Sequence, residues 1–195
     1  MPPAVRSRRV ARTVALAAAA SLAAITAAGC GDDTEAQARA AEASARKADL
    51  ALCTKQVKPL QTALSNVEAD LGVGINYNAY AEEVRSIARA YAKMDIDAIA
   101  ASSKKVIAAA PTAATDSTCL GAAASFENAF NAYNKANSIW GDCIDNIIAY
   151  GDCTSGPVNT RIQAQWTKAS SAIANGERRL ARLETLGDRA STTQE

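Results

Sequence analysis

Apolar side chains recur at alternating spacings of three and four residues through four long stretches of this chain. In the first stretch these residues are Leu50, Cys53, Val57, Leu60, Leu64, Val67 and Leu71. This spacing gives a helix one continuous apolar stripe, as in bundles and coiled coils. No segment alternates with a period of two, so no strand is expected. The pattern therefore predicts an all-α protein.

The other three stretches follow the same spacing. The second contains Tyr77, Tyr80, Val84, Ile87, Tyr91, Met94 and Ala98. The third contains Cys119, Ala122, Phe126, Ala129, Tyr133, Ala136, Trp140, Cys143, Ile147 and Tyr150. The fourth contains Ile162, Trp166, Ala169, Ile173, Gly176, Leu180 and Leu183. Helices of about thirty residues, roughly 45 Å long, joined by short connections favour antiparallel neighbours.

We therefore predict an up-down-up-down four-helix bundle over residues 48–187, followed by a disordered tail at 188–195. Two interruptions are expected inside it. Pro59 should bend the first helix or mark its true first turn, and Asp95, after which the apolar residues move to another face, marks a kink or a second start.

Residues that start and stop helices bound these stretches. Asn76 or Asn78 is the expected N-cap of the second helix, and Asp116 or Ser117 that of the third. Pro157 fits the first turn of the fourth helix. The expected stops are Gly72 to Gly74, Pro111, Gly151 and Gly187.

The first thirty residues have the pattern of an export signal. Arginines at positions 6, 8, 9 and 12 precede a nearly all-apolar run from Thr13 to Ala28, which is short for a membrane span. Ala27-Ala28-Gly29-Cys30 resembles the lipobox of bacterial lipoproteins, although Ala27 stands where that family usually has Leu. The resemblance implies cleavage after residue 29 and acylation of the Cys30 thiol. An ordinary cleaved signal is the alternative, and Ser7-Arg8-Arg9-Val10 leaves both the twin-arginine and the Sec route open.

Export followed by lipidation of Cys30 would place the mature chain on the extracytoplasmic face of the cell membrane. Two or three acyl chains on this cysteine would hold it there, because several chains anchor a protein far better than one. The Ala-rich, charged stretch that follows then predicts a lipidated tether over residues 30–47, with a frayed helix start as the alternative for the part up to about Ala45.

Four cysteines remain for an exported chain: Cys53, Cys119, Cys143 and Cys153. An even number in that compartment indicates two disulfides. Cys119 lies on the third helix roughly 36 Å from Cys143, and Cys153 lies near the opposite end of that helix, so Cys119 can bond to neither. The remaining pairing is Cys53–Cys119 with Cys143–Cys153. A four-thiolate metal site is disfavoured because no Cys-x-x-Cys occurs.

Composition excludes several functions. The chain has no histidine, which removes Ser-His and Cys-His catalysis, His-ligated zinc or haem and the Glu-x-x-His di-iron pattern. Without residues 1–29, which hold four of its 21 Lys+Arg and no acid, it carries 17 basic and 20 acidic residues, near −3 net. A mildly acidic chain argues against nucleic-acid binding. We expect no cofactor and no metal.

Three groups of side chains are candidate sites, each with a plainer interpretation that we favour. The acids Asp142, Asp145 and Asp152 could bind a hard cation or stay solvated. A basic group could touch anionic polymers or complement a helix dipole; it comprises Arg178, Arg179, Arg182 and Arg189. An aromatic group could line a pocket or fill the core; it comprises Tyr77, Tyr80, Tyr91, Tyr133, Trp140 and Trp166.

The spacing of Trp140-Gly141-Asp142-Cys143, Cys153 and Trp166-Thr167-Lys168-Ala169 resembles that of small Ala-rich helical lipoproteins of actinobacteria, as does Gly72-Val73-Gly74-Ile75-Asn76-Tyr77. The resemblance covers most of the mature chain and speaks to fold rather than activity. It carries over no catalytic or binding residues.

The leading functional hypothesis is a non-enzymatic, lipid-anchored envelope protein that binds a protein partner. An exposed apolar strip would mark its partner site, and the small-residue faces at 108–110 and 122–124 are the places predicted for it. The alternatives are a lipoprotein that binds a small molecule or ion in the bundle, and an enzyme with paired carboxylates, which a narrow bundle disfavours.

Overall fold

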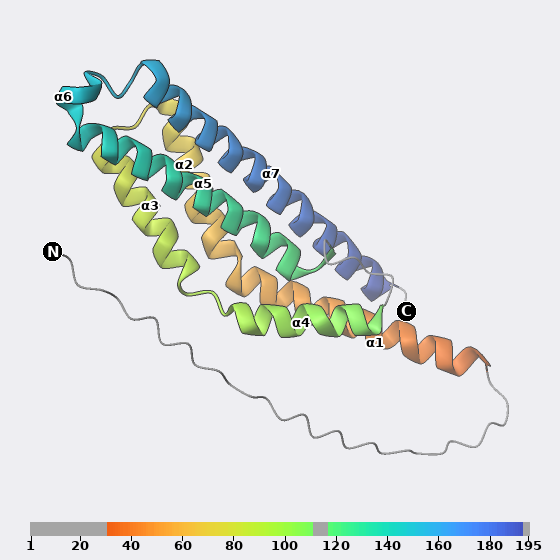
Figure 1. The fold of residues 1–195 in the computed structure, drawn as a ribbon. Helices are drawn as coiled ribbons and strands as arrows, with labels where there is room; N and C mark the ends of the chain where they lie inside the picture. Colours follow the sequence, from red (N-terminus) through yellow and green to blue (C-terminus); the bar gives the residue numbers. More distant parts are fainter. Residues whose placement is uncertain (1–30, 111–116, 193–195) are drawn as a thin grey trace. The chain divides into compact units, whose positions relative to one another are not determined.

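The computed structural model describes residues 31–110 and 117–192 of the 195-residue chain. The chain divides after Gly31, and the helical unit that begins at Asp32 is described by itself. Seven helices occupy the described ranges, and no strand occurs within them. They are α1 (Gly31–Gln56), α2 (Lys58–Val73), α3 (Tyr77–Tyr91), α4 (Ile96–Ala109), α5 (Cys119–Asp145), α6 (Ile147–Tyr150) and α7 (Gly156–Thr192) (Figure 1). The predicted all-α class is confirmed.

The first two predicted helices are each divided in two. α2 begins at Lys58 with Pro59 in its first turn, where the missing proline N–H costs no helical hydrogen bond. α4 begins after Asp95, whose carboxylate accepts a hydrogen bond from the backbone N–H of Ala98 at 2.9 Å. The Gln56 side chain also accepts a hydrogen bond from the Asp95 N–H at 3.3 Å. The break between α1 and α2 therefore lies beside the break between α3 and α4.

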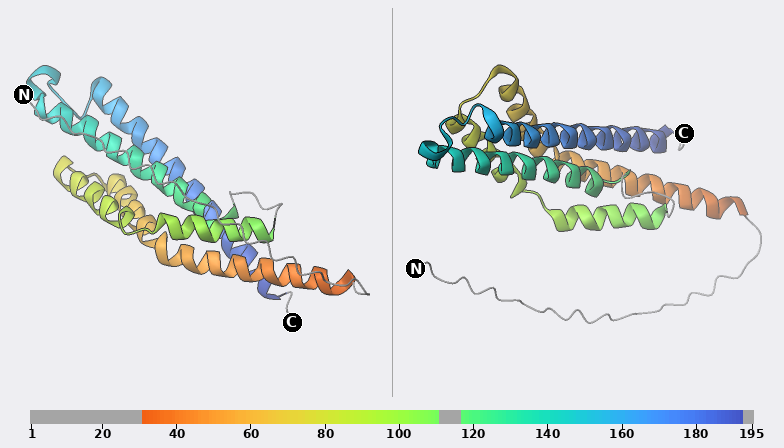
Figure 2. Two further views of the ribbon diagram at one scale, coloured as in Figure 1. Left: turned by 60° about the horizontal axis from the view of Figure 1, so that its bottom comes forward. Right: turned by 45° about the horizontal axis from the view of Figure 1, so that its top comes forward.

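The largest helix–helix contact joins α5 to α7, and α2 and α3 pack against this pair and against each other (Figures 1 and 2). α4 contacts the first half of α5. The stripes of apolar residues predicted from the sequence meet in this core. Its fully buried side chains include Leu60, Leu64, Val67, Tyr80, Ile87, Phe126, Tyr133 and Ala169.

A buried carboxylate ties α1 to the start of α5. Asp49 has no exposed surface, and it accepts hydrogen bonds from the Cys119 N–H at 2.8 Å and from the Ser103 hydroxyl at 3.3 Å. The Ser103 hydroxyl in turn accepts from the Leu120 N–H at 3.1 Å. The N-cap of α5 is Thr118 rather than Ser117, and Asp116 lies outside the described residues. Asp49 and Ser103 satisfy two of the free N–H groups at this helix end.

The Cys53–Cys119 disulfide lies one turn further along α1, with Cα atoms 5.3 Å apart. The second pair, Cys143 and Cys153, has Cα atoms 5.9 Å apart. These are the two pairs predicted from the lengths of the helices.

The helices at both ends of the unit are longer than predicted. α1 begins at Gly31, within the stretch expected to be a tether or a frayed helix start, and α7 continues to Thr192 through residues assigned to the tail. Gly187 does not end α7, which continues past it. It lies instead where α7 packs closely against α1. A Cβ there would lie 3.0 Å from Cδ2 of Leu50, so glycine lets α7 approach α1.

Candidate interaction site

The chain reverses direction sharply between α5 and α7. α5 ends at Asp145, the single-turn α6 follows, and Gly151 adopts a positive φ of 75° that favours glycine. The Cys143–Cys153 disulfide closes this turn. The Asp152 carboxylate accepts hydrogen bonds from the N–H and the hydroxyl of Thr154, both at 2.7 Å. Hydrogen bonds from Ser155 and Thr154 lower the pKa of Asp152.

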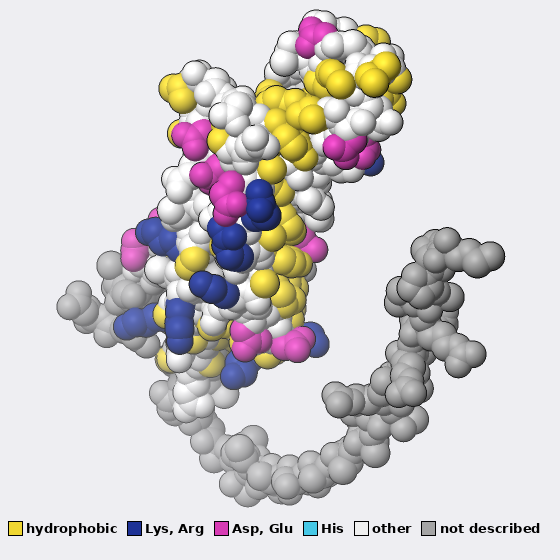
Figure 3. All heavy atoms as spheres, turned by 90° about the vertical axis from the view of Figure 1, so that its left-hand side faces the viewer, with side chains coloured by type: hydrophobic (Ala, Val, Ile, Leu, Met, Phe, Trp, Pro, Cys, Tyr) yellow, Lys and Arg dark blue, Asp and Glu magenta, His cyan; other side chains and the backbone are white. Residues whose placement is uncertain are grey.

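Four large apolar side chains, one in the last turn of α5 and three on α6, face solvent. Ile148 is 100% exposed, Tyr150 54%, Ile147 45% and Ile144 38%. We call these four residues the apolar tip. In Figure 3 hydrophobic side chains gather with acidic ones at the upper end of the molecule, where α6 lies, and most basic side chains lie below them.

The apolar tip corrects the sequence analysis, which placed Ile147 and Tyr150 on the buried stripe of the third helix. Their spacing continues that of Trp140 and Cys143. The helix stops at Asp145, however, and the disulfide turns the chain away, so the apolar residues of α6 leave the core.

The three aspartates noted in the sequence, Asp142, Asp145 and Asp152, are all exposed around the tip. Nowhere in the described ranges do three or more His, Cys, Asp or Glu side chains converge to hold a metal ion. No Lys or Arg occurs between residues 136 and 160, or between residues 59 and 84, which cover α2 after its first residue and the first half of α3. The three aspartates of the tip therefore have no basic residue beside them in sequence, and Arg161, exposed near the start of α7, is the first one to follow.

Aromatic rings pack beneath the tip, where α3, α5 and α7 meet. The Trp140 ring lies 5.7 Å from Tyr77, 5.7 Å from Tyr80 and 5.9 Å from Trp166, centroid to centroid. The Tyr80 ring lies 6.4 Å from that of Tyr133 in an edge-to-face arrangement. The interpretation of these residues as core packing fits this geometry. Tyr91 belongs elsewhere, against Phe130 at 5.5 Å.

Some polar atoms of this aromatic group form hydrogen bonds and others do not. The Tyr80 hydroxyl donates a hydrogen bond to the backbone carbonyl of Tyr133 at 2.8 Å. Asn137 Oδ1 is buried without a hydrogen-bond partner. The Tyr133 hydroxyl and Trp166 Nε1 make no hydrogen bond of good geometry, although Ser170 lies beside Tyr133 and Tyr80 beside Trp166. Burial raises the pKa of Tyr80 and of Tyr133, and the charge of Glu68 raises that of Tyr133 further.

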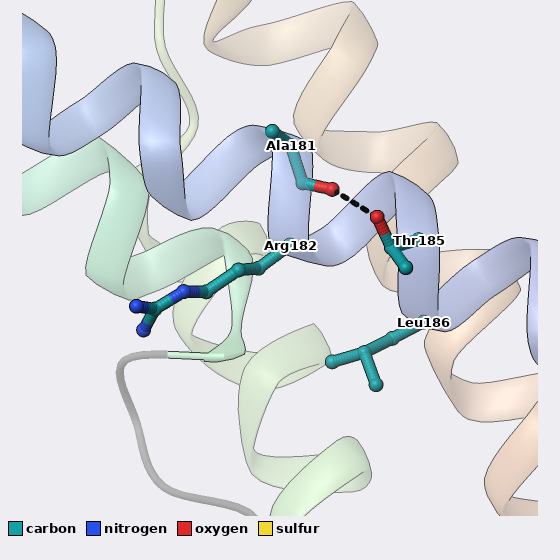
Figure 4. Close-up of a pocket in the computed structure, with 4 residues that line it drawn as sticks. All are labelled: Ala181, Arg182, Thr185 and Leu186. Atoms are coloured by element: carbon teal, nitrogen blue, oxygen red, sulfur yellow. Dashed lines mark hydrogen bonds between the residues drawn. The ribbon is translucent and has the colours of Figure 1, made fainter.

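A shallow groove lies on the second half of α7. It has a volume of about 380 Å³ and is lined by Ala181, Arg182, Thr185 and Leu186 (Figure 4). Thr185 donates its hydroxyl to the Ala181 carbonyl at 2.9 Å, so that polar pair is already satisfied within the helix. Arg178 and Arg182 are exposed on this part of α7, Arg179 is half-buried, and the side chain of Arg189 lies outside the described residues.

The small-residue faces do not form the exposed strip expected of a partner site. Ala122 and Ala123 are buried in α5, as is Ala110 after α4, whereas Ala108 and Ala124 are exposed singly.

The apolar tip was not predicted from the sequence. A signal for it was present, because Ile147-Ile148-Ala149-Tyr150 lies within the loop closed by two cysteines of the predicted pairing.

Cys30, the predicted lipidation site, lies outside the described residues, as does the predicted signal peptide. No helix within the described ranges combines the length and the apolar character needed to cross a membrane. Comparison with protein-family models, with curated proteins and with solved structures finds no match to this chain.

Proposed function

We propose that the mature chain is a lipid-anchored envelope protein, attached through Cys30 to the extracytoplasmic face of a bacterial membrane, that acts as a non-enzymatic interaction module. The lipobox-like Ala27-Ala28-Gly29-Cys30 and the preceding basic and apolar segments support the anchor. The absence of histidine from the sequence supports a binding role over most hydrolytic chemistry.

The single observation that carries the interaction role is the apolar tip. Scattered exposed apolar residues are normal on a soluble protein, whereas four large ones on one rigid turn mark an interaction site. Ile148 alone is fully exposed, and no described element covers it.

The direction of the helices makes this surface suitable for display. We propose an up-down-up-down four-helix arrangement in which α1 with α2, α3 with α4, α5 and α7 form the four columns. The start of α1 lies at the opposite end of the helical unit from α6 (Figures 1 and 2). A helix of 37 residues such as α7 is about 55 Å long, so a chain anchored before α1 presents the tip well away from the membrane.

The anchor is tested by comparing the native chain with a Cys30→Ala form. The native chain is expected in the membrane fraction and in the detergent phase after detergent phase separation, with a diacylglyceryl mass on its first peptide. The Cys30→Ala form should lose both the acyl mass and the partitioning. If Cys30→Ala remains in the membrane fraction, the proposed anchor is wrong.

The interaction role is tested by chemical cross-linking on intact cells with a tagged chain. One dominant adduct is expected, and it should disappear in an Ile148→Ser form. The matched control is Ile96→Ser, which also replaces an exposed isoleucine but at the start of α4, away from the tip. Loss of the adduct in both forms, or in neither, would contradict a role for the tip.

Binding of a small molecule within the bundle is the second candidate. It is favoured by Asn137 Oδ1, which is buried beside this aromatic group without a hydrogen-bond partner, since buried polar groups normally have partners. Native mass spectrometry of protein taken from the envelope would show a retained small molecule in this case. The same chain unfolded and refolded in pure buffer is the control and should have the bare mass.

A further inference from the structure

We propose that the apolar tip binds a protein segment that combines apolar side chains with Lys or Arg. This inference rests on the proposed interaction role and adds the chemistry of the partner.

The exposed area of Ile144, Ile147, Ile148 and Tyr150 is of the order of a few hundred Å², the size of functional patches on monomeric proteins. A tyrosine beside isoleucines is also the composition of an interface centre rather than of an ordinary surface. The partner therefore requires an apolar surface opposite the tip.

The acidic charge around the tip favours a partner that carries basic residues beside its apolar surface. Asp142, Asp145 and Asp152 are exposed and have no basic residue near them in sequence from 136 to 160. The second half of α2, which ends at the same end of the unit, adds Glu68 and Asp70 without Lys or Arg between residues 59 and 84, whereas Glu82 on α3 is paired with Arg85 and Arg89. A partner with basic residues around its apolar surface complements this field and is steered toward it, whereas an acidic partner is repelled.

The tip is also held in place before binding. The Cys143–Cys153 disulfide joins the two ends of the turn, and the hydrogen bonds that Thr154 donates to Asp152 fix its second end. A rigid surface loses little conformational freedom on association, which favours binding through a small contact area.

Two other occupants fit less well. A second copy docked tip to tip about a two-fold axis would bring the aspartates of both copies together, and like charges facing each other are unfavourable. Insertion into a membrane would carry the same aspartates toward anionic lipid headgroups.

The test places a photoreactive benzophenone side chain at position 148 of the full chain, in intact cells of the source bacterium. Ile148 is fully exposed, so this replacement leaves the core unchanged. The matched control carries the benzophenone at Glu184, an exposed position on the second half of α7. Adduct peptides are then identified by mass spectrometry, with and without the charge reversal Asp142→Lys with Asp145→Lys.

The expected result is one protein adduct at position 148 and none at position 184. Its cross-linked segment should contain apolar residues together with Lys or Arg. Reversing the two charges should lower the adduct yield about tenfold, whereas Glu184→Lys should change it less than twofold. Unchanged circular dichroism and thermal midpoint for the reversal form would show that it folds.

Several outcomes would overturn the inference: an adduct to a second copy of this chain, an adduct to lipid, an acidic or uncharged contact segment, or an unchanged yield after charge reversal. A specific protein adduct with the wrong contact chemistry would refute only this inference and leave the interaction role standing. Equal labelling at positions 148 and 184 would refute both.

Discussion

Replacing Asp49 by alanine should strongly destabilise the fold, although Asp49 lies outside every apolar stripe. The carboxylate is fully buried and accepts hydrogen bonds from the Cys119 N–H and the Ser103 hydroxyl. A hydrogen bond to a charged group contributes about 1.5–3 kcal/mol, and a buried donor left unpaired costs a similar amount. The position beside the N-terminus of α5 adds about 0.3–1 kcal/mol through the helix dipole.

Together these contributions give an expected loss of about 4 kcal/mol in the free energy of unfolding for Asp49→Ala. With an m-value in urea of about 2 kcal/mol per molar, the midpoint should fall by about 2 M. The measurement is urea unfolding followed by circular dichroism, with both disulfides intact. Asp142→Ala is the control, because that carboxylate is exposed on α5.

Ser103→Ala should cost about 1–2 kcal/mol, since it removes the acceptor of the Leu120 N–H and one donor to Asp49. The double variant should cost less than the sum of the two single variants, because Asp49 and Ser103 interact directly. A midpoint shift below about 0.5 M for Asp49→Ala, or strict additivity in the double variant, would refute this reasoning.

Three further predictions concern the core, each measured by urea unfolding. Tyr80→Phe should lower the free energy of unfolding by about 1 kcal/mol, because it removes a hydrogen bond of good geometry. Tyr133→Phe should cost clearly less, because that buried hydroxyl makes no such bond; equal losses would contradict this. Burial raises the pKa of both phenols, so their contribution to the free energy of unfolding is complete below the unfolded pKa of about 10 and is lost as pH rises further. The variant with both tyrosines changed to Phe should therefore lose less stability above this pH than the native chain. Identical plots of the free energy of unfolding against pH would refute the point. Gly176→Ala should lower the free energy of unfolding by about 1–3 kcal/mol, because its Cβ would lie 2.6 Å from the Phe126 ring. Gly72→Ala should raise it by about 0.5 kcal/mol, because its Cβ would meet nothing within 4 Å. A gain in stability at both positions would be inconsistent with the packing.

The sequence was sufficient to predict the helices, their breaks and the disulfide pairing, because these depend on local properties. Spacings of three and four residues predicted the buried faces, and Pro59 and Asp95 marked both breaks. The length of α5 separates Cys119 from Cys143 and left one pairing.

What the sequence could not supply depended on neighbours distant along the chain. Gly187 has the character of a helix end, yet it serves the contact with Leu50 on α1. Asp49 resembles a solvated charge until Cys119 and Ser103 are brought to it. Tyr150 keeps the spacing of a buried residue, and only the turn after α5 exposes it.

The Cys53–Cys119 disulfide determines how the folded unit would carry mechanical load. Tension applied between the start of α1 and the tip would pass along α1 to Cys53, cross the bond to Cys119 and continue through α5 to α6. The intervening helices α2, α3 and α4 lie in a covalently closed loop outside this path, so pulling would not unravel them. Reduction of the bond would place that segment, which spans a sequence separation of 66, under tension and allow the chain to lengthen by as much as roughly 220 Å.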